Sequence, residues 1–172
     1  DVRNLFRSSC QVGEIMIDPV ELMQLAVEAA QSGIADGQSP FGCAIASNDK
    51  VLAVAHNTVV ASTDITAHAE INALRAACRV AEQVHLEESL VATTCEPCPM
   101  CMAALHWARV GTVLFGATIA DAESAGFNEL RVPAAEVLKI GGSTVRLESG
   151  VLAHECQQLF RLWQECPDRV VY

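Results

Sequence analysis

The spacing of apolar residues in the first third of the chain predicts a helix and then a hairpin. Between residues 19 and 33, apolar side chains recur every three or four positions, which is the period of a helix with one buried face. Asp18 precedes this segment as a candidate N-cap, and Glu21 is placed as its reciprocal capping partner. Two short apolar runs, 42–47 and 50–57, then flank an Asn-Asp pair, which is typical of two strands joined by a tight turn.

From residue 66 the pattern alternates between helix-like and strand-like segments. In order, we expect a helix at 66–80, a strand at 89–94, a helix at 98–109, a strand at 112–117, a loop and short helix up to 140, a strand at 143–147 and a helix at 151–165. Such alternation predicts a sheet with helices on both faces. Because the sheet begins with a hairpin, its five strands should be mixed in direction, which makes the fold an α/β three-layer sandwich. We assign residues 18–172 to one domain and interpret residues 1–17, which show no clear period, as an N-terminal arm or tail.

Composition narrows the class of protein. Although 51% of the residues are hydrophobic, no apolar run approaches the roughly 18 to 20 residues of a membrane span, so we expect a soluble protein without a membrane partner. The first residues lack the pattern of a secretory signal, and we interpret the eight cysteines as reduced thiols of a cytoplasmic protein. The net charge of −10 comes without a cluster of Lys and Arg, which argues against nucleic acid and favours a small, weakly charged substrate.

Candidate chemistry is concentrated in the stretch CEPCPMC, residues 95–101. Cys98 and Cys101 are three positions apart at the start of a predicted helix, so both sulfurs can reach one ion. His68 begins the preceding predicted helix, and helices that follow neighbouring strands begin at the same edge of a sheet. One His and two Cys give zinc three ligands and leave the fourth position for water, as in catalytic sites. Glu70 is then placed as an outer carboxylate that takes a proton and passes it on.

The residues alone leave two other interpretations of this stretch open. Cys95 can complete a closed structural zinc site with His68, Cys98 and Cys101, with no position left for water. Alternatively, the two cysteines of CPMC can form a redox dithiol, since such motifs also occur where a strand meets a helix.

Several segments resemble the zinc-dependent cytidine deaminase superfamily. His-Ala-Glu at 68–70, followed by Pro-Cys-Pro-Met-Cys at 97–101, is similar to the signature H-x-E…P-C-x-x-C of these enzymes. PFGCAI at 40–45, TAHAEINALR at 66–75 and TTCEPCPMCMAALHWARV at 93–110 resemble the branch that contains guanine deaminases and tRNA adenosine deaminases. The resemblance extends from about residue 18 to residue 172, and it implies the same three-layer α/β fold that the pattern predicts.

The resemblance implies a metal site and a set of catalytic groups. His68, Cys98 and Cys101 would ligate Zn²⁺, and Glu70 would shuttle protons during attack on the amino-bearing ring carbon. The backbone N–H groups of Ala69 and Cys98, at two helix N-termini, would stabilise the developing negative charge on oxygen.

The resemblance also assigns roles around the substrate and between subunits. Asn57 would contact the base, Phe41 and Phe127 would pack near it, and Trp107 would line the pocket. Without the resemblance, Asn57 is a strand-ending residue that turns the chain, and Phe41 and Trp107 are core aromatics. The resemblance further implies that Asp121 is a second proton-handling carboxylate and that Tyr172 belongs to a C-terminal segment that closes over the site. It also implies that the protein is a homodimer.

The expected function is zinc-dependent hydrolytic deamination of a small amino-substituted nucleobase or nucleoside, with guanine favoured and ammonia released. Two departures keep alternatives in view. Asn128 and Glu129 stand where guanine deaminases commonly have two Asp, and the last helix is similar to that of the tRNA enzymes. The alternatives are a deaminase of cytosine, cytidine or another amino-heterocycle, a tRNA adenosine deaminase, and a non-enzymatic zinc or dithiol protein.

Overall fold

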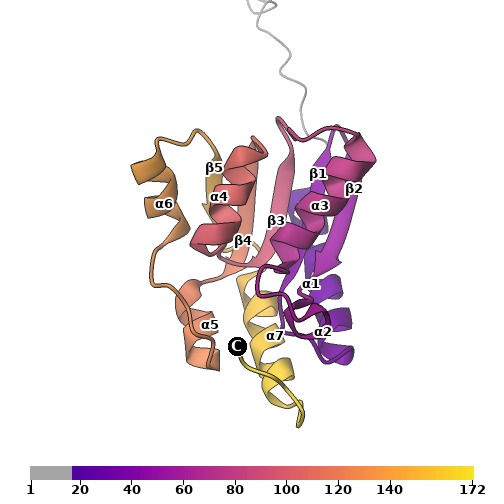
Figure 1. Cartoon of the computed structure of the whole chain (residues 1–172), viewed down its shortest axis with the longest axis vertical. Coiled ribbons are helices and arrows are strands. Elements are labelled where there is room, and N and C mark those ends of the chain that lie inside the picture. The colour runs from indigo at the N-terminus through magenta and orange to yellow at the C-terminus, as the bar shows by residue number, and fades with distance from the viewer. Residues whose placement is uncertain (1–16) are drawn as a thin grey trace, which may run out of the picture.

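The computed structural model describes residues 17–172, which form a mixed five-stranded sheet with helices packed on both of its faces (Figure 1). The elements are α1 (Pro19–Ala35), β1 (Gly42–Ser47), β2 (Lys50–His56), α2 (Val59–Ser62), α3 (Ala69–Ala81), β3 (Leu90–Cys95), α4 (Pro99–Trp107), β4 (Thr112–Ala117), α5 (Ile119–Ala125), α6 (Ala134–Gly141), β5 (Arg146–Ser149) and α7 (Ala153–Gln164). This architecture confirms the predicted three-layer α/β fold. Most of the predicted arm, residues 1–16, lies outside the described part of the chain, and Ile17 packs against the core.

The direction of the strands determines where the site forms. The sheet order is β2-β1-β3-β4-β5; β1 is antiparallel to both β2 and β3, whereas β3, β4 and β5 are parallel. Strands β2, β3 and β4 therefore run in the same direction and end at one edge of the sheet, at His56, Cys95 and Ala117. The segments that follow these three strands, including the starts of α3, α4 and α5, meet at that edge.

Two apolar layers hold the helices on the sheet. One layer packs α1 and α7 against the sheet, and the other packs α3, α4 and α6 against the opposite face. Asp18 is the N-cap residue of α1 as predicted and accepts a hydrogen bond from the Val20 backbone N–H at 2.8 Å, while the reciprocal contact of Glu21 stays a prediction. Its buried face includes Leu22, Met23 and Val27, and burial of each such side chain contributes about 1.5–3 kcal/mol.

Some boundaries differ from the prediction for local reasons. The helix expected from residue 66 begins at Ala69, because the Asp64 carboxylate accepts hydrogen bonds from the backbone and the hydroxyl of Thr66 and holds that stretch in a turn. The short helix α2 was not predicted. The last strand is at 146–149, not 143–147, because Thr112 of β4 pairs with Arg146. Within residues 17–172, no helix has the length and hydropathy that crossing a bilayer requires.

Candidate active site

Three side chains come together where α3 and α4 begin. His68 is the N-cap residue of α3, Cys98 is the N-cap residue of α4, and Cys101 lies in the first turn of α4. The Nδ1 atom of His68 lies 3.7 Å from Cys98 Sγ and 3.5 Å from Cys101 Sγ, and one ligand atom from each of the three residues lies within 4.8 Å of the others. The predicted ligands are therefore adjacent in space although thirty residues separate them in sequence.

The chemistry of this group fits a zinc ion with one open position. Imidazole nitrogen and two thiol sulfurs are the donors that Zn²⁺ prefers. A hydrogen bond with Cys101, helped by His68 and opposed by burial, lowers the pKa of Cys98 to about 4, so that this thiol is a thiolate at neutral pH. The same hydrogen bond, together with burial, raises the pKa of Cys101. Binding Zn²⁺ requires the second thiol to release its proton as well.

Cys95 is not part of this cluster. Its Sγ atom contacts the Thr118 carbonyl oxygen at 3.5 Å, and the metal-ligating group found among the described residues comprises His68, Cys98 and Cys101 alone. The structure therefore favours an open site with two cysteines and one histidine over a closed site with three cysteines. The imidazole beside the two thiols likewise favours a metal site over a simple dithiol.

Glu70 lies behind the three ligands, in the first turn of α3. Its side chain is buried, and burial together with the nearby Cys98 raises its pKa, against an opposing effect of His68. The hydroxyl of Thr93, on β3, donates a hydrogen bond to Glu70 Oε1 at 3.3 Å. Thr93 is paired with Cys43 across β1 and β3, so both strands support this carboxylate. A buried carboxyl with a raised pKa is suited to taking and releasing protons near neutral pH.

A cavity of about 280 Å³ opens beside the ligands and Glu70. Apart from them, its walls include Phe41, Asn57, Cys95, Glu96, Phe127, Glu129, Leu130 and Tyr172. The rings of Phe41 and Phe127 lie 4.9 Å apart between centroids, and those of Phe127 and Tyr172 lie 5.9 Å apart. The cavity thus combines an aromatic wall with ionisable groups at one end.

Asn57 presents its amide in this cavity and is 1% exposed. Its Oδ1 atom accepts from the Val59 backbone N–H at 3.0 Å, and its Nδ2 atom donates to the Tyr172 hydroxyl at 2.6 Å. Burial raises the pKa of Tyr172 to about 12, which keeps the phenol protonated. The C-terminal residue therefore closes one side of the cavity. Ala69, the first residue of α3, is also buried, between His68 and Glu70.

The prediction that Trp107 lines the pocket is wrong for this chain. Its side chain is 73% exposed and borders a separate, shallow hollow with Ile71 and Val84. The reason is helical geometry: Trp107 follows Cys98 by nine positions, which corresponds to a rotation of about 180° and a rise of about 13 Å.

Asp121 is also not placed for catalysis. It forms a capping box with Thr118 at the start of α5, accepting from the Thr118 backbone N–H at 2.8 Å and from its hydroxyl at 2.7 Å. Its other carboxylate oxygen accepts from Gln157 at 3.2 Å, and the residue is absent from the cavity wall. The carboxylate stabilises a helix N-terminus instead.

Glu129 is a further carboxylate at the cavity, beside Glu70 and Glu96, and sequence reasoning did not single it out as a site residue. Burial, together with the charge of Cys98, raises its pKa. The one hint of Glu129 in the sequence was that Asn128 and Glu129 stand where guanine deaminases commonly have two Asp. Its position depends on tertiary contacts of the 126–133 segment that a local pattern does not contain.

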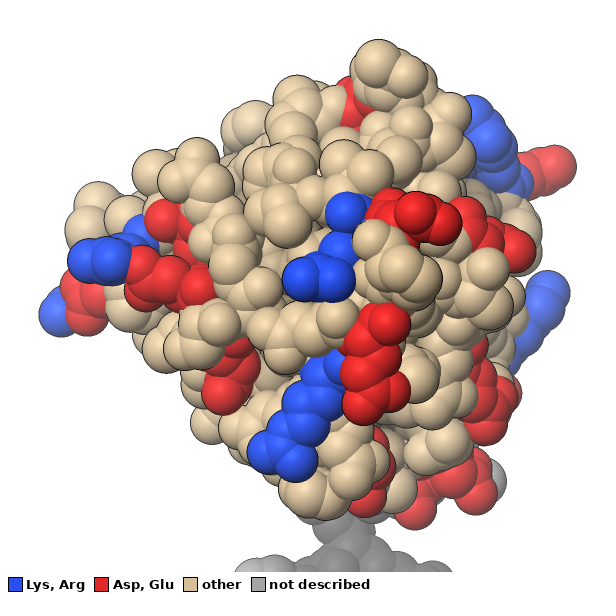
Figure 2. All heavy atoms as spheres, turned by 90° about the horizontal axis from the view of Figure 1, so that it is seen from below, with Lys and Arg blue, Asp and Glu red and all other residues tan. Residues whose placement is uncertain are grey.

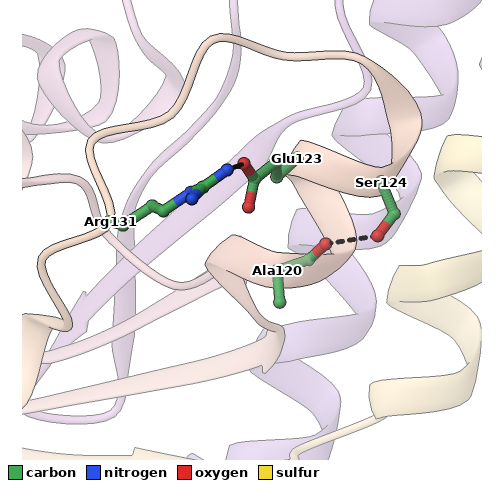
Figure 3. A network of polar contacts seen from close by, with 4 residues as sticks. All are labelled: Ala120, Glu123, Ser124 and Arg131. Carbon is green, nitrogen blue, oxygen red and sulfur yellow. Dashed lines mark hydrogen bonds and ion pairs between the residues drawn. The ribbon is translucent and has the colours of Figure 1, made fainter.

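Side-chain hydrogen bonds connect the 126–133 segment to α5 and hold the starts of the two helices that flank it. Glu96 accepts hydrogen bonds from Ile119 N at 3.3 Å and from Ala134 N at 2.9 Å, and so joins the starts of α5 and α6. Arg131 Nε donates to Glu123 at 2.7 Å, which ties the segment back onto α5 (Figure 3). In the same view, the Ser124 hydroxyl donates to the Ala120 carbonyl at 2.7 Å within α5.

Comparison with known proteins agrees with this geometry. Residues 16–117 match the family described as the cytidine and deoxycytidylate deaminase zinc-binding region. Guanine deaminase of Bacillus subtilis (strain 168) is 42% identical over 105 residues, which cover 61% of this chain and 65% of that protein. A tRNA-specific adenosine deaminase of Agrobacterium fabrum (strain C58 / ATCC 33970) is 34% identical over 102 residues, which cover 59% of this chain and 67% of that protein.

Two solved structures are similar over nearly the whole chain. Guanine deaminase from Nitrosomonas europaea has a TM-score of 0.79 at 28% identity, covering 88% of this chain and 87% of that one. NE0047 in complex with 2,6-diaminopurine has a TM-score of 0.81 at 28% identity, covering 92% and 87%. The zinc-binding family confirms the predicted cofactor, and the chain belongs to the family of the cytidine and deoxycytidylate deaminase zinc-binding region.

Proposed function

We propose that this protein deaminates guanine by hydrolysis. The observation that carries the proposal is that the ligand group His68, Cys98 and Cys101 lies at a cavity that His68, Cys98 and the buried Glu70 line together. His68, Cys98 and Cys101 would hold Zn²⁺, which would supply the Lewis-acid chemistry that activates water. Water adds to the amino-bearing ring carbon, the C–N bond breaks, and ammonia leaves.

In this proposal two carboxylates handle protons. Glu70 takes one proton from the attacking water and delivers it to the ring nitrogen, and it then passes the second proton of that water to the departing amine, while the Thr93 hydroxyl donates a hydrogen bond to Glu70 Oε1. Glu129 takes the second proton-handling role that the resemblance implied for Asp121. Its place on the cavity wall and its raised pKa support this assignment.

The lining of the cavity supports an uncharged substrate. Among the described residues that form its walls, the charged ones are Glu70, Glu96 and Glu129, and none is Lys or Arg. A phosphate would be repelled there, which favours a base or nucleoside over a nucleotide. On the end of the molecule shown in Figure 2, basic side chains lie among acidic ones and do not gather into a patch for tRNA. The guanine deaminase relatives favour guanine as the base.

An ammonia-release screen tests the proposal. Zinc-loaded protein is incubated with guanine, guanosine, cytosine, cytidine and adenine, and with a tRNA anticodon stem-loop. We expect guanine to give the highest kcat/KM. Absence of ammonia from guanine in a preparation with one zinc per chain would refute the proposal, and turnover of another compound would identify the substrate in its place.

We further propose that the protein is a cytoplasmic homodimer. The hollow between α3 and α4 is bordered by apolar side chains, and Trp107 and Val84 at its rim are 73% and 72% exposed. An exposed apolar face of this kind supports association with a second copy. The cysteines of residues 17–172 are free thiols, which supports a reducing compartment.

A further inference from the structure

Asn72 makes three hydrogen bonds at the edge of the site. It lies on α3, two residues after Glu70, and its Nδ2 atom donates to the His56 carbonyl at 3.0 Å, the Thr58 hydroxyl at 2.9 Å and the Ala67 carbonyl at 3.2 Å. One side-chain amide thus joins three positions that belong to two separate parts of the chain.

The three acceptors surround residues of the site. His56 and Thr58 are the two neighbours of Asn57, and Ala67 directly precedes the ligand His68. The backbone closes the same connection, because Thr58 N donates to the Ala67 carbonyl at 3.0 Å. Asn72 therefore bridges the strand end that carries the Asn57 amide and the turn that carries His68.

We propose that Asn72 is a positioning residue that fixes the Asn57 amide relative to the metal ligands. Two N–H hydrogens shared among three oxygens suit a primary amide, whereas an aliphatic side chain would remove this donor from all three oxygens and leave the Ala67 carbonyl with its bond from Thr58 N. Asn57 itself holds its Oδ1 against Val59 N, so that its orientation depends on the backbone on either side of it. The inference rests on the proposed function through the role of Asn57 in binding the base.

Kinetics of Asn72→Ala test this coupling. We expect KM for guanine to rise about tenfold, with a smaller change in kcat and unchanged zinc content, because the displaced amide is a binding group. Ser62→Ala is the matched control: it removes the 2.7 Å hydrogen bond from the Ser62 hydroxyl to the Thr58 carbonyl and should leave KM unchanged. In an Asn57→Ala background, Asn72→Ala should raise KM no further. A wild-type KM in Asn72→Ala, or an equal further rise on top of Asn57→Ala, would overturn the proposal.

Amide hydrogen exchange tests the positioning role of Asn72 independently of the proposed deamination of guanine. The amides of Asn57 and Thr58 donate to Phe41 and Ala67, and we expect both to exchange at least tenfold faster in Asn72→Ala than in wild type. Unchanged exchange would refute the positioning role whether or not guanine is the substrate. If wild type releases no ammonia from guanine, the proposed function fails and exchange alone decides the role of Asn72. Asn72→Thr keeps one donor and replaces the alanine variant if that one does not fold.

Discussion

At the scale of single residues, the buried carboxyl of Glu70 separates metal binding from catalysis. Glu70→Ala should retain one zinc, because Glu70 is not among the three ligands, and should lose turnover by a factor of about 10² to 10⁴. Ammonia release and zinc content are measured on the same preparation. Glu148→Ala, an exposed position on β5, is the control. Activity within about tenfold of wild type, a loss of only about 1.4 kcal/mol in barrier, would contradict the proton-transfer role.

Glu129 allows a second test of the same kind. Glu129→Gln keeps the shape of the side chain but removes the proton-handling group, so we expect kcat to fall by about 10²-fold with little change in KM or zinc content. Steady-state kinetics with guanine measure both constants. An unchanged kcat would leave Glu70 as the sole carboxylate required for turnover.

These residues also show what local sequence can predict. The ligand cysteines were predictable because a three-residue spacing at a helix start places both sulfurs on one face, and His68 followed from the order of strands and helices. Glu129 was not predictable in this way, since the path of its segment depends on the hydrogen bonds from Arg131, inside the segment, to Glu123 of α5 and from Ala134 N, directly after it, to Glu96. The spacing of residues along one helix can be read from neighbouring positions in the sequence. The path of a loop depends on contacts with residues that are distant in the sequence.

At the scale of elements, the cap of α5 decides the role of Asp121. Asp121→Ala removes the carboxylate of the capping box and should lower the free energy of unfolding by about 1 kcal/mol while kcat stays at the wild-type value. Urea denaturation and ammonia release provide the two measurements. A loss of kcat similar to that of Glu129→Gln would restore the catalytic role that the resemblance implied for it.

The stability that the Asp121 cap contributes depends on pH, and the lowered pKa of Asp121 gives the direction of that dependence. Burial tends to raise the pKa of Asp121, but the hydrogen bonds from Thr118 and Gln157 outweigh it and lower the pKa below the ordinary value of 3.8. The charged cap therefore stabilises the fold fully above pH 3.8, and this contribution declines as the pH falls through the lowered pKa. The stability difference between wild type and Asp121→Ala should accordingly be constant near neutral pH and shrink only in acid.

Element boundaries were predicted less well than element types. The helix expected from residue 66 begins at Ala69 because Asp64 holds a turn, and α2 escaped notice because four residues carry no measurable period. The strand expected at 143–147 is shifted because pairing with β4 sets its register. For the two shifted boundaries, hydrogen bonding to specific neighbours overrides the apolar pattern.

At the scale of the whole molecule, the C-terminus reaches the site from α7. Arg169 donates to the Cys166 carbonyl at 3.1 Å and lies 5.8 Å from the Trp163 ring, and Tyr172 follows it to Asn57. Deleting residues 167–172 should raise KM for guanine by about tenfold, because the cavity loses one wall and Asn57 loses a partner. Tyr172→Phe, which removes only the hydroxyl, should give a smaller rise. Unchanged kinetics for the deletion would show that the segment does not act on substrate.

The exposed apolar face between α3 and α4 predicts how the protein assembles. If α3 and α4 associate with a second copy, wild type should sediment at twice the chain mass of 18.4 kDa. Trp107→Glu places a charge on that apolar face and should give a folded monomer, because the desolvated carboxylate would have no partner there. Ile140→Glu is the matched control, since Ile140 is 82% exposed on α6 and outside the hollow, and it should remain dimeric. A dimeric Trp107→Glu would exclude this face as the interface, and a monomeric wild type would exclude the dimer.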